Sequence, residues 1–298
     1  MPVGIGDLLF GIPLAGFAVQ NRFNQHRAGL GRLPLFIDKD LSTAANRHTT
    51  DIADHPERLA QPDSSKPNFV DPHIGSDGSA PADRIIAAAA AGGWRPENDT
   101  TGEIMQWGGA FLSVDAALHF WLVESAHHRE RVEDPAYTHM GFSASHNSSA
   151  DEWNYTVDFA RSPTRPLYSV NSGKVLDVTN MSNDHGAPIQ QWDWWGGWNQ
   201  QFTMEPTDGG YVRLRARNSG LVLDVAGVSR DNGARIIQWD WWGGENQQFL
   251  PEVFGIGEIK LTARHSGRSL DVKDFSVDNG APIQQWDWWG GANQRWRF

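Results

Sequence analysis

In the second half of the chain, short runs of alternating apolar and polar residues recur with a fixed period of 47 residues. Each period holds about four such runs, separated by Asn/His-Ser-Gly and Asn/His-Gly turns. The segment at residues 190–202 recurs with near identity at 237–249 and 284–296, and no insertion or deletion separates the copies. A strict period of this size predicts three copies of one supersecondary unit.

One unit of about four short strands is too small to bury its own apolar face. Three units can close around a pseudo-threefold axis, which removes most exposed sheet edges. Residues 167–298 are therefore predicted to form an all-β domain, a β-trefoil with three 47-residue repeats. Phe202, Phe249 and Trp296 end the three copies and are predicted to lie in its core.

The first half shows helical rather than alternating spacing. Helices are predicted at residues 9–27, 41–54, 81–91 and 114–124, and strands at residues 138–145 and 152–159. Helices packed around a small antiparallel sheet account for this pattern, so residues 1–160 are predicted to be an α+β domain. Residues 161–166 carry two prolines and are predicted to be a short extended linker.

Composition narrows the class of protein. A chain of 298 residues with 39% apolar content can build two domains, each with its own core. The net charge of −11 argues against a nucleic-acid partner, which requires clustered Lys and Arg. The absence of Cys excludes disulfides and thiol chemistry. The apolar stretch at residues 3–19 lacks a basic flank and is too interrupted to span a bilayer, so neither a clear signal peptide nor a transmembrane segment is predicted.

Three sequence signatures occur once in each repeat: Leu-Asp-Val, then a tryptophan preceded two residues earlier by Gln or Ile, then Asn-Gln-x-Phe/Trp. Together they resemble the ricin B-type lectin family. In that family the Asp accepts sugar hydroxyls, the Trp stacks on the pyranose ring, and Gln and Asn complete the rim. The resemblance implies carbohydrate-binding sites at Asp177, Gln190, Trp192, Asn199 and Gln200, at Asp224, Trp239, Asn246 and Gln247, and at Asp271, Gln284, Trp286, Asn293 and Gln294.

The residues themselves suit such a ligand, because a sugar presents an apolar C–H face and a ring of hydroxyls. Ile237 replaces the first glutamine in the second repeat, so the second site is expected to be weaker or silent. The family often has a disulfide within the repeat, at the positions of Trp194 and Val175 here. We expect the Trp194 indole to pack there, leaving Trp195 and its two copies as the more exposed aromatic side chains.

An ordered series of short motifs covers the first half. The series comprises Asn21-Arg22-Phe23, Arg27-Ala28-Gly29-Leu30, His73-Ile74-Gly75-Ser76-Asp77-Gly78, Gly102-Glu103, Trp121, His128-Arg129, Asp134-Pro135-Ala136-Tyr137 and Tyr155-Thr156-Val157-Asp158-Phe159. In this order and spacing it resembles the bacterial branch of the CAP superfamily, the cysteine-rich secretory and pathogenesis-related proteins. The resemblance spans about residues 15–160 and implies an α/β/α sandwich.

In several members of that superfamily a cleft of histidines and glutamates binds a divalent cation. The matching metal ligands are His73, Glu103, Glu124 and His128, and imidazole with carboxylate suits Zn or a similar cation. If the helix continues past residue 124, Glu124 and His128 lie on one helical face. The choice between His127 and His128 stays open, and a hydrogen-bonded cluster without metal is the alternative interpretation.

The sequence therefore predicts a secreted carbohydrate-binding protein, in which a trefoil targets a CAP domain to glycan surfaces. Galactose-type ligands are common in the trefoil family, although the sugar and the oligomeric state stay open. The alternative is a lectin-targeted, metal-dependent hydrolase that acts through the CAP cleft. No Cys nucleophile and no Gly-x-Ser-x-Gly elbow is present, so a defined enzymatic activity is the less favoured interpretation.

Overall fold

The computed structural model describes residues 8–9, 12–59, 71–109, 112–148, 151–161, 164–254 and 257–298. The chain forms two compact units, Met1–Ser162 and Pro163–Phe298, and each is considered by itself. The boundary falls within the stretch predicted as a linker. Across the described ranges, every helix is too short or too polar to cross a lipid bilayer.

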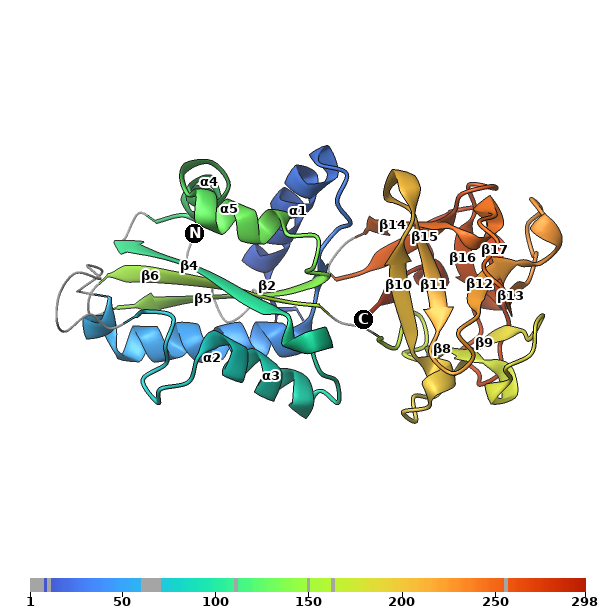
Figure 1. The fold of residues 1–298 in the computed structure, drawn as a ribbon, viewed down its shortest axis with the longest axis horizontal. Helices are drawn as coiled ribbons and strands as arrows, with labels where there is room; N and C mark the ends of the chain where they lie inside the picture. The colour runs from blue at the N-terminus through green and yellow to red at the C-terminus, as the bar shows by residue number, and fades with distance from the viewer. Residues whose placement is uncertain are drawn as a thin grey trace. The chain divides into compact units, whose positions relative to one another are not determined.

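The first unit is a sandwich of two helical layers around one sheet (Figure 1). The sheet has the strand order β3-β5-β6-β4, with β3 parallel to β5 and the other neighbours antiparallel. Its strands are β3 (Phe36–Ile37), β4 (Thr101–Gly109), β5 (His139–Asn147) and β6 (Glu152–Ala160). Helices α2 (Lys39–Asp54) and α3 (Pro81–Ala91) cover one face, and α1 (Leu14–Gly29), α4 (Val114–His119) and α5 (Ala126–Glu133) cover the other. This confirms the predicted α+β sandwich.

Local sequence sets where these helices begin. The Asp38 side chain accepts hydrogen bonds from the backbone N–H groups of Asp40 and Leu41, which caps α2. The helix predicted from residue 9 is wrong at its start, because β1 (Leu8–Leu9) pairs with β2 (Ile12–Pro13) and α1 begins only at Leu14. Proline lacks a backbone N–H and is disfavoured inside a helix, so the boundary directly after the proline follows from its chemistry.

Each face of the sheet buries apolar side chains. Phe23 of α1 packs edge-on against Trp121 with ring centroids 5.9 Å apart, and it also stacks with Phe159 of β6. On the opposite face, α2 crosses β5 at Gly141, where a Cβ atom would lie 2.1 Å from the Leu41 backbone. This close approach requires glycine and brings α2, which carries His48, down onto the sheet.

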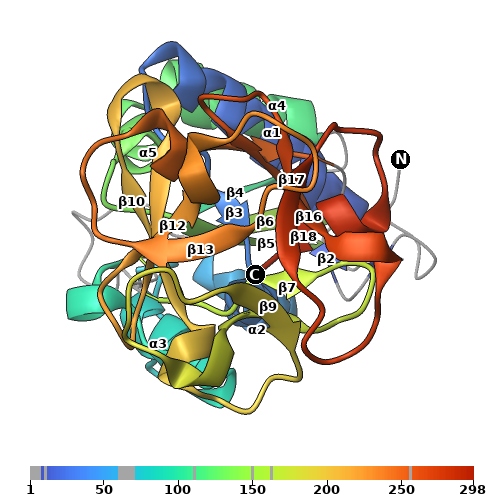
Figure 2. The same cartoon turned by 90° about the vertical axis from the view of Figure 1, so that its right-hand side faces the viewer.

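The described residues of the second unit form twelve strands, four in each repeat, as the periodicity predicts. The repeats comprise β7 (Tyr168–Ser169), β8 (Val175–Val178), β9 (Ile189–Trp192) and β10 (Phe202–Pro206), then β11 (Val212–Ala216), β12 (Val222–Val225), β13 (Ile236–Trp239) and β14 (Phe249–Val253), then β15 (Ile259–Ala263), β16 (Ser269–Val272), β17 (Ile283–Trp286) and β18 (Trp296–Arg297). Figure 2 shows the three repeats, coloured from yellow-green to red, around a common centre.

A closed ring of strands forms the barrel of this unit. Hairpins β10–β11 and β14–β15 are joined by the pair Val212 and Phe249, and β18 pairs with both β15 and β7. A bridge between Arg165 and Phe202 completes the ring. Phe202, Phe249 and Trp296 are at most 3% exposed, so their predicted place in the core is confirmed.

One glutamine in each repeat ties that repeat to its neighbour. The Gln238 amide nitrogen donates to the carbonyls of Ser182 and Asp184 in the first repeat, at 2.9 and 3.0 Å, and its oxygen accepts from the Ser219 hydroxyl. Gln191 bonds in the same way to the third repeat, and Gln285 to the second. All three glutamines are fully buried. The contacts therefore run around the threefold arrangement without a break.

The substitution Gln238→Ala is expected to lower the free energy of unfolding of the trefoil by about 3 kcal/mol, because two carbonyls and one hydroxyl lose their buried partner. The measurement is the denaturation midpoint in urea, with the slope unchanged. Gln201→Ala serves as the control, because Gln201 is half-buried and its amide bonds to the Gly196 and Gly197 carbonyls are 3.3 and 3.4 Å long. Its oxygen accepts from the exposed Arg217 side chain, which water can solvate in its place. A Gln238 variant as stable as the control would contradict this role.

Candidate functional site

In the first repeat, a buried carboxylate collects the amides predicted to bind sugar. Asp177 on β8 lies opposite Gln190 on β9, and its Oδ1 accepts from the Gln190 amide at 2.9 Å. Its Oδ2 accepts from Asn199 and Gln200, both at 3.0 Å. The structure thus brings four of the five predicted residues of this site into one hydrogen-bonded cluster.

The fifth residue, Trp192, lies on the surface beside this cluster. It follows Gln190 by two positions on β9, so both side chains share one face of the strand. Its side chain is 39% exposed. Its ring edge approaches Gly280 of the third repeat, where a Cβ atom would lie 3.7 Å from the Trp192 Cζ3. The aromatic platform is thus positioned by two repeats.

The third repeat reproduces this geometry. Asp271 accepts from Gln284 at 2.9 Å and from Asn293 at 2.8 Å, and Trp286 is 39% exposed. Gln294 is fully buried, like Gln200 in the first repeat. The first and third repeats therefore carry equivalent arrangements of an exposed aromatic ring beside a buried carboxylate.

The second repeat differs where the sequence predicts. Asp224 accepts from Gln247 at 2.9 Å and Trp239 is 41% exposed, but Ile237 has no amide to offer the carboxylate. The Asn246 amide donates to the Val225 carbonyl at 3.3 Å. This site keeps its platform and its carboxylate, and it loses one amide group from the cluster.

Gln200 lies beneath the site rather than on its rim. Its side-chain nitrogen donates to the Asp177 carboxylate and to the Asp193 backbone carbonyl. Its side-chain oxygen accepts from the backbone N–H of Trp195 at 3.0 Å. The side chain is fully buried, as are those of Gln247 and Gln294. A glutamine with its polar atoms occupied in this way fixes the loop and the carboxylate, so the rim position expected from the resemblance is wrong for these three residues.

Burial sets the ionisation of the three carboxylates. Burial raises the pKa of Asp177 and Asp224, and the amide hydrogen bonds that they accept oppose this effect. Burial likewise raises the pKa of Asp271 to about 6, against the opposing effect of its amide donors. Asp271 therefore changes its protonation state just below neutral pH.

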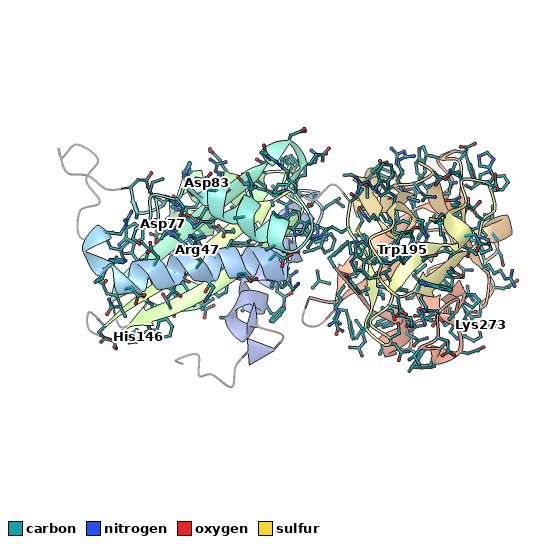
Figure 3. The ribbon with its side chains drawn as sticks, turned by 90° about the horizontal axis from the view of Figure 1, so that it is seen from below. Arg47, Asp77, Asp83, His146, Trp195 and Lys273 are labelled. Carbon is teal, nitrogen blue, oxygen red and sulfur yellow. The ribbon has the colours of Figure 1, made fainter. Side chains whose placement is uncertain are left out.

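A second exposed tryptophan occurs in each repeat. Trp195, Trp242 and Trp289 are 54%, 59% and 52% exposed. Trp194 is 41% exposed, while its copies Trp241 and Trp288 are half-buried beneath the cationic side chains of Arg213 and Lys260. The expectation that the second tryptophan of each pair is the more exposed one is confirmed. Trp195 is labelled in Figure 3.

In the first unit, two of the predicted metal ligands are in contact. The Glu103 carboxylate on β4 accepts from the His73 Nδ1 at 2.7 Å and from the Arg84 guanidinium at 2.7 Å. The loop that carries His73 is tied to α2 by an ion pair of 2.6 Å between Arg47 and Asp77 (Figure 3). Glu103 is buried, and its two oxygen atoms are bound by groups from different elements.

A second carboxyl group lies beside Glu103. Asp158 on β6 is its cross-strand neighbour and is fully buried. Burial and the negative charge of Glu103 raise the pKa of Asp158 well above its usual range. Burial would also raise the pKa of Glu103, but the His73 hydrogen bond and the charges of His48 and Arg84 lower it. Of the two carboxyl groups, Glu103 therefore ionises more readily, and Asp158 keeps its proton more readily.

His128 lies on α5, in the other helical layer, and is near enough to His73 to sense its charge. Its Nδ1 lies 2.7 Å from the Ser125 hydroxyl. Burial, followed by the neighbouring charges of His127 and His73, lowers the pKa of His128 to about 4, so its ring is neutral at pH 7. His127 is exposed. Of the two histidines, His128 is therefore the more buried one.

Glu124 does not lie on one helical face with His128, so this expectation is wrong. The helix changes to a π-helical turn at Phe120–Glu124 and then breaks at Ser125, whose φ and ψ are −106° and 105°. The Glu124 side chain is 58% exposed and lies 3.3 Å from His119. A break of one residue rotates the following helix, which separates two side chains that a continuous helix would align.

The remaining predicted metal ligands, His73 and His128, do not form a complete ligand set. Among the residues that the structure describes, no group of three or more His, Asp or Glu side chains could hold a metal ion. His73 and His128 each turn Nδ1 toward a hydrogen-bond partner, and their Nε2 atoms bond to no described residue. Imidazoles whose Nδ1 is bound by a partner in this way also occur in metal sites.

Sequence reasoning gave no role to Arg84 and Asp158, although both surround Glu103. Asp158 could have been found as a charged residue within an otherwise buried strand, Tyr155 to Ala160. Arg84 gives no such signal, because an arginine in the first turns of a helix is ordinarily a solvent-exposed residue. Its contact depends on how α3 packs beside β4.

Comparison with known proteins gives two family matches. Residues 20–159 match the cysteine-rich secretory protein family, a CAP domain. Three overlapping segments, residues 149–239, 198–286 and 245–298, match the ricin-type beta-trefoil lectin domain-like family. No curated protein matches the chain.

Several solved structures are similar to part of the chain. The designed threefold-symmetric protein ThreeFoil is 44% identical over 45% of this chain and 96% of its own, with a TM-score of 0.45. An exo-beta-1,3-galactanase from Clostridium thermocellum is 28% identical over 54% of this chain and 45% of its own, with a TM-score of 0.45. The Rhizoctonia solani agglutinin is 24% identical over 46% and 93%, with a TM-score of 0.42. The chain belongs to the ricin-type β-trefoil lectin domain-like family and carries an N-terminal CAP domain of the cysteine-rich secretory protein family.

Proposed function

We propose that this protein binds carbohydrate through its trefoil at the clusters of Asp177 and Asp271, and more weakly at that of Asp224. The observation that carries the proposal is an exposed tryptophan beside a buried, amide-bonded aspartate in every repeat. The indole face offers an apolar surface for the C–H face of a sugar, and the carboxylate accepts hydrogen bonds from the sugar hydroxyls.

The trefoil acts as the targeting part of a protein that works outside the cell. Single shallow sugar sites bind weakly, and two or three of them on one domain gain avidity on a surface dense in glycans. We infer ligands of the galactose type, in keeping with the family resemblance. The CAP domain is thereby concentrated at the glycan surface.

The double substitution Trp192→Ala, Trp286→Ala is expected to remove most glycan binding, because each lost platform weakens its site by about 1 to 3 kcal/mol. The measurement is a glycan array with the wild-type protein and the folded variant. The single substitution Trp239→Ala is the matched control and is expected to change binding less. Binding that persists in the double variant would contradict the assignment of these sites, and an array on which the wild type binds nothing would contradict the function itself.

Binding at the third site is expected to weaken as the pH falls from 7 to 5. The carboxylate form of Asp271, with a pKa of about 6, predominates at pH 7 and is reduced about tenfold at pH 5, so the third site loses affinity by about that factor. The measurement is titration calorimetry on a variant that carries Trp192→Ala and Trp239→Ala, with the glycan found on the array. Adding Asp271→Asn should remove the pH dependence. Affinity that is equal at the two pH values would contradict the role of Asp271.

We further propose that the CAP cleft binds one divalent cation, Zn or a similar ion, through His73 and His128. The orientation of both rings by hydrogen bonds supports this, and a bound cation would supply Lewis-acid polarisation. Glu103 would hold the His73 ring through Nδ1 while being held itself by Arg84. A carboxylate engaged in this way is poorly placed as a general base, which favours a binding module over a hydrolase.

Zinc analysis by mass spectrometry after dialysis tests this second proposal. We expect about one zinc ion per chain for the wild type and a loss of zinc in the variant His73→Ala, His128→Ala, because both ligands are removed. His127→Ala is the matched control, since His127 is an exposed neighbour, and it should retain the ion. Wild-type protein without bound zinc, or a double variant that keeps it, would refute the assignment.

A further inference from the structure

Each repeat exposes a large apolar side chain at a turn where the backbone is left-handed. Met181, Val228 and Phe275 have φ angles of 52°, 54° and 54°, and their side chains are 59%, 49% and 48% exposed. They occupy equivalent positions, 47 residues apart. This conformation is unfavourable for non-glycine residues and especially for β-branched or bulky ones.

These side chains contribute little to burial, so core packing does not account for them. In the third repeat, the Phe275 ring lies 4.7 Å from the ring of Trp289, centroid to centroid. The equivalent tryptophans, Trp195 and Trp242, stand at the same positions in the first and second repeats. Every repeat thus places an exposed apolar residue and an exposed indole at equivalent positions of the site's two loops.

The indole ring of Trp195 and of its copies packs directly against a glycine, which has no side chain to displace it. A Cβ atom on Gly197 would lie 2.3 Å from the Trp195 ring, and one on Gly244 would lie 2.2 Å from the Trp242 ring. The ring therefore rests on the glycine backbone with its other side toward solvent. A preorganised aromatic face loses little conformational entropy when a ligand stacks on it.

This second platform borders the same carboxylate–amide cluster as Trp192. A Cβ atom added to Gly197, which would meet the Trp195 ring, would also lie 2.5 Å from the Asn199 Oδ1. The Asn199 nitrogen in turn donates to Asp177. Asn199 is 3% exposed, and its Oδ1 has no hydrogen-bond partner among the described residues; the same holds for Asn246 and Asn293. Trp192 approaches the cluster from the side of Gly280, and Trp195 from the side of Gly197.

We propose that Trp195, Trp242 and Trp289, together with Met181, Val228 and Phe275, form a second aromatic subsite beside each sugar site. It takes the next residue of an oligosaccharide whose first residue stacks on Trp192, Trp239 or Trp286. Binding of disaccharides and longer glycans is therefore stronger than binding of the single sugar. This inference rests on the proposed carbohydrate binding and specifies its ligand class.

A neutral glycan fits this surface better than a membrane does. Asp274 directly precedes Phe275 in the same left-handed turn, and its side chain is exposed. Asp193 and Asp287 are exposed as well, and each is paired with one cation, Lys174 or Arg268. Carboxylates beside an apolar platform do not attract anionic lipid headgroups. They accept hydrogen bonds from sugar hydroxyls, as Asp177 does from amides.

The test compares one sugar series, from monosaccharide to trisaccharide, on the array and then by calorimetry. We expect the wild type to bind the disaccharide at least about tenfold more tightly than the monosaccharide. The triple variant Trp195→Ala, Trp242→Ala, Trp289→Ala should lose this advantage and keep its monosaccharide affinity. Replacement of the same three residues by Phe should restore part of it, because an aromatic face is retained.

The control is the triple variant Trp194→Ala, Trp241→Ala, Trp288→Ala, which should keep the preference for the longer glycan. Equal wild-type affinity for the monosaccharide and the disaccharide would overturn the inference while leaving the proposed function intact. A folded triple variant at Trp195 that loses both ligands equally would also overturn it. The inference would also be overturned if the wild type, but not this variant, bound glycan-free phosphatidylcholine vesicles, because the three tryptophans would then contact lipid. An absence of all glycan binding by the wild type would instead refute the proposed function.

Discussion

The trefoil is held together by one glutamine side chain in each repeat, which bonds to the backbone of a neighbouring repeat. Gln191, Gln238 and Gln285 are fully buried, and each donates to two backbone carbonyls of the neighbouring repeat. Buried carbonyls without partners would destabilise the fold, so each repeat needs a neighbour for its own polar groups as well as for its apolar ones. The closed order of these contacts explains why three repeats form one unit.

Buried polar groups that depend on such partners also lie beneath the surface sites. Beneath each exposed tryptophan, a buried glutamine holds an aspartate whose desolvation would otherwise be costly, and that aspartate stays within reach of the surface. The cost of burial is visible in the raised pKa of Asp271. In the CAP domain the opposite balance holds at Glu103, where Arg84 and His73 lower the pKa of a buried carboxylate next to Asp158, whose pKa is raised. Both sites depend on partners that come from different strands or loops.

Periodicity in the sequence predicts the strands of each repeat and the core positions of Phe202, Phe249 and Trp296, because these follow from the local pattern of apolar residues. The exposure of Trp195 is predicted only through the family resemblance. Periodicity does not show that Gln200 is buried, since an exposed and a buried amide look alike in a sequence. In the CAP domain, β4 and α5 escaped prediction, and Glu124 was misplaced by one non-helical residue, Ser125. The ligands of Glu103 come from α3 and a distant loop, and such contacts depend on tertiary packing.

The position of Trp192 against Gly280 bears on how such a domain could arise. A lone ancestral repeat would carry the tryptophan and the aspartate, but it would lack the glycine of another repeat that borders the ring. It would have to associate as a trimer of identical peptides before any of its sites was complete, and its activity would vary with its concentration. Tandem duplication replaces that association with a covalent link. Once linked, the copies are free to diverge, as Ile237 in the second repeat has done.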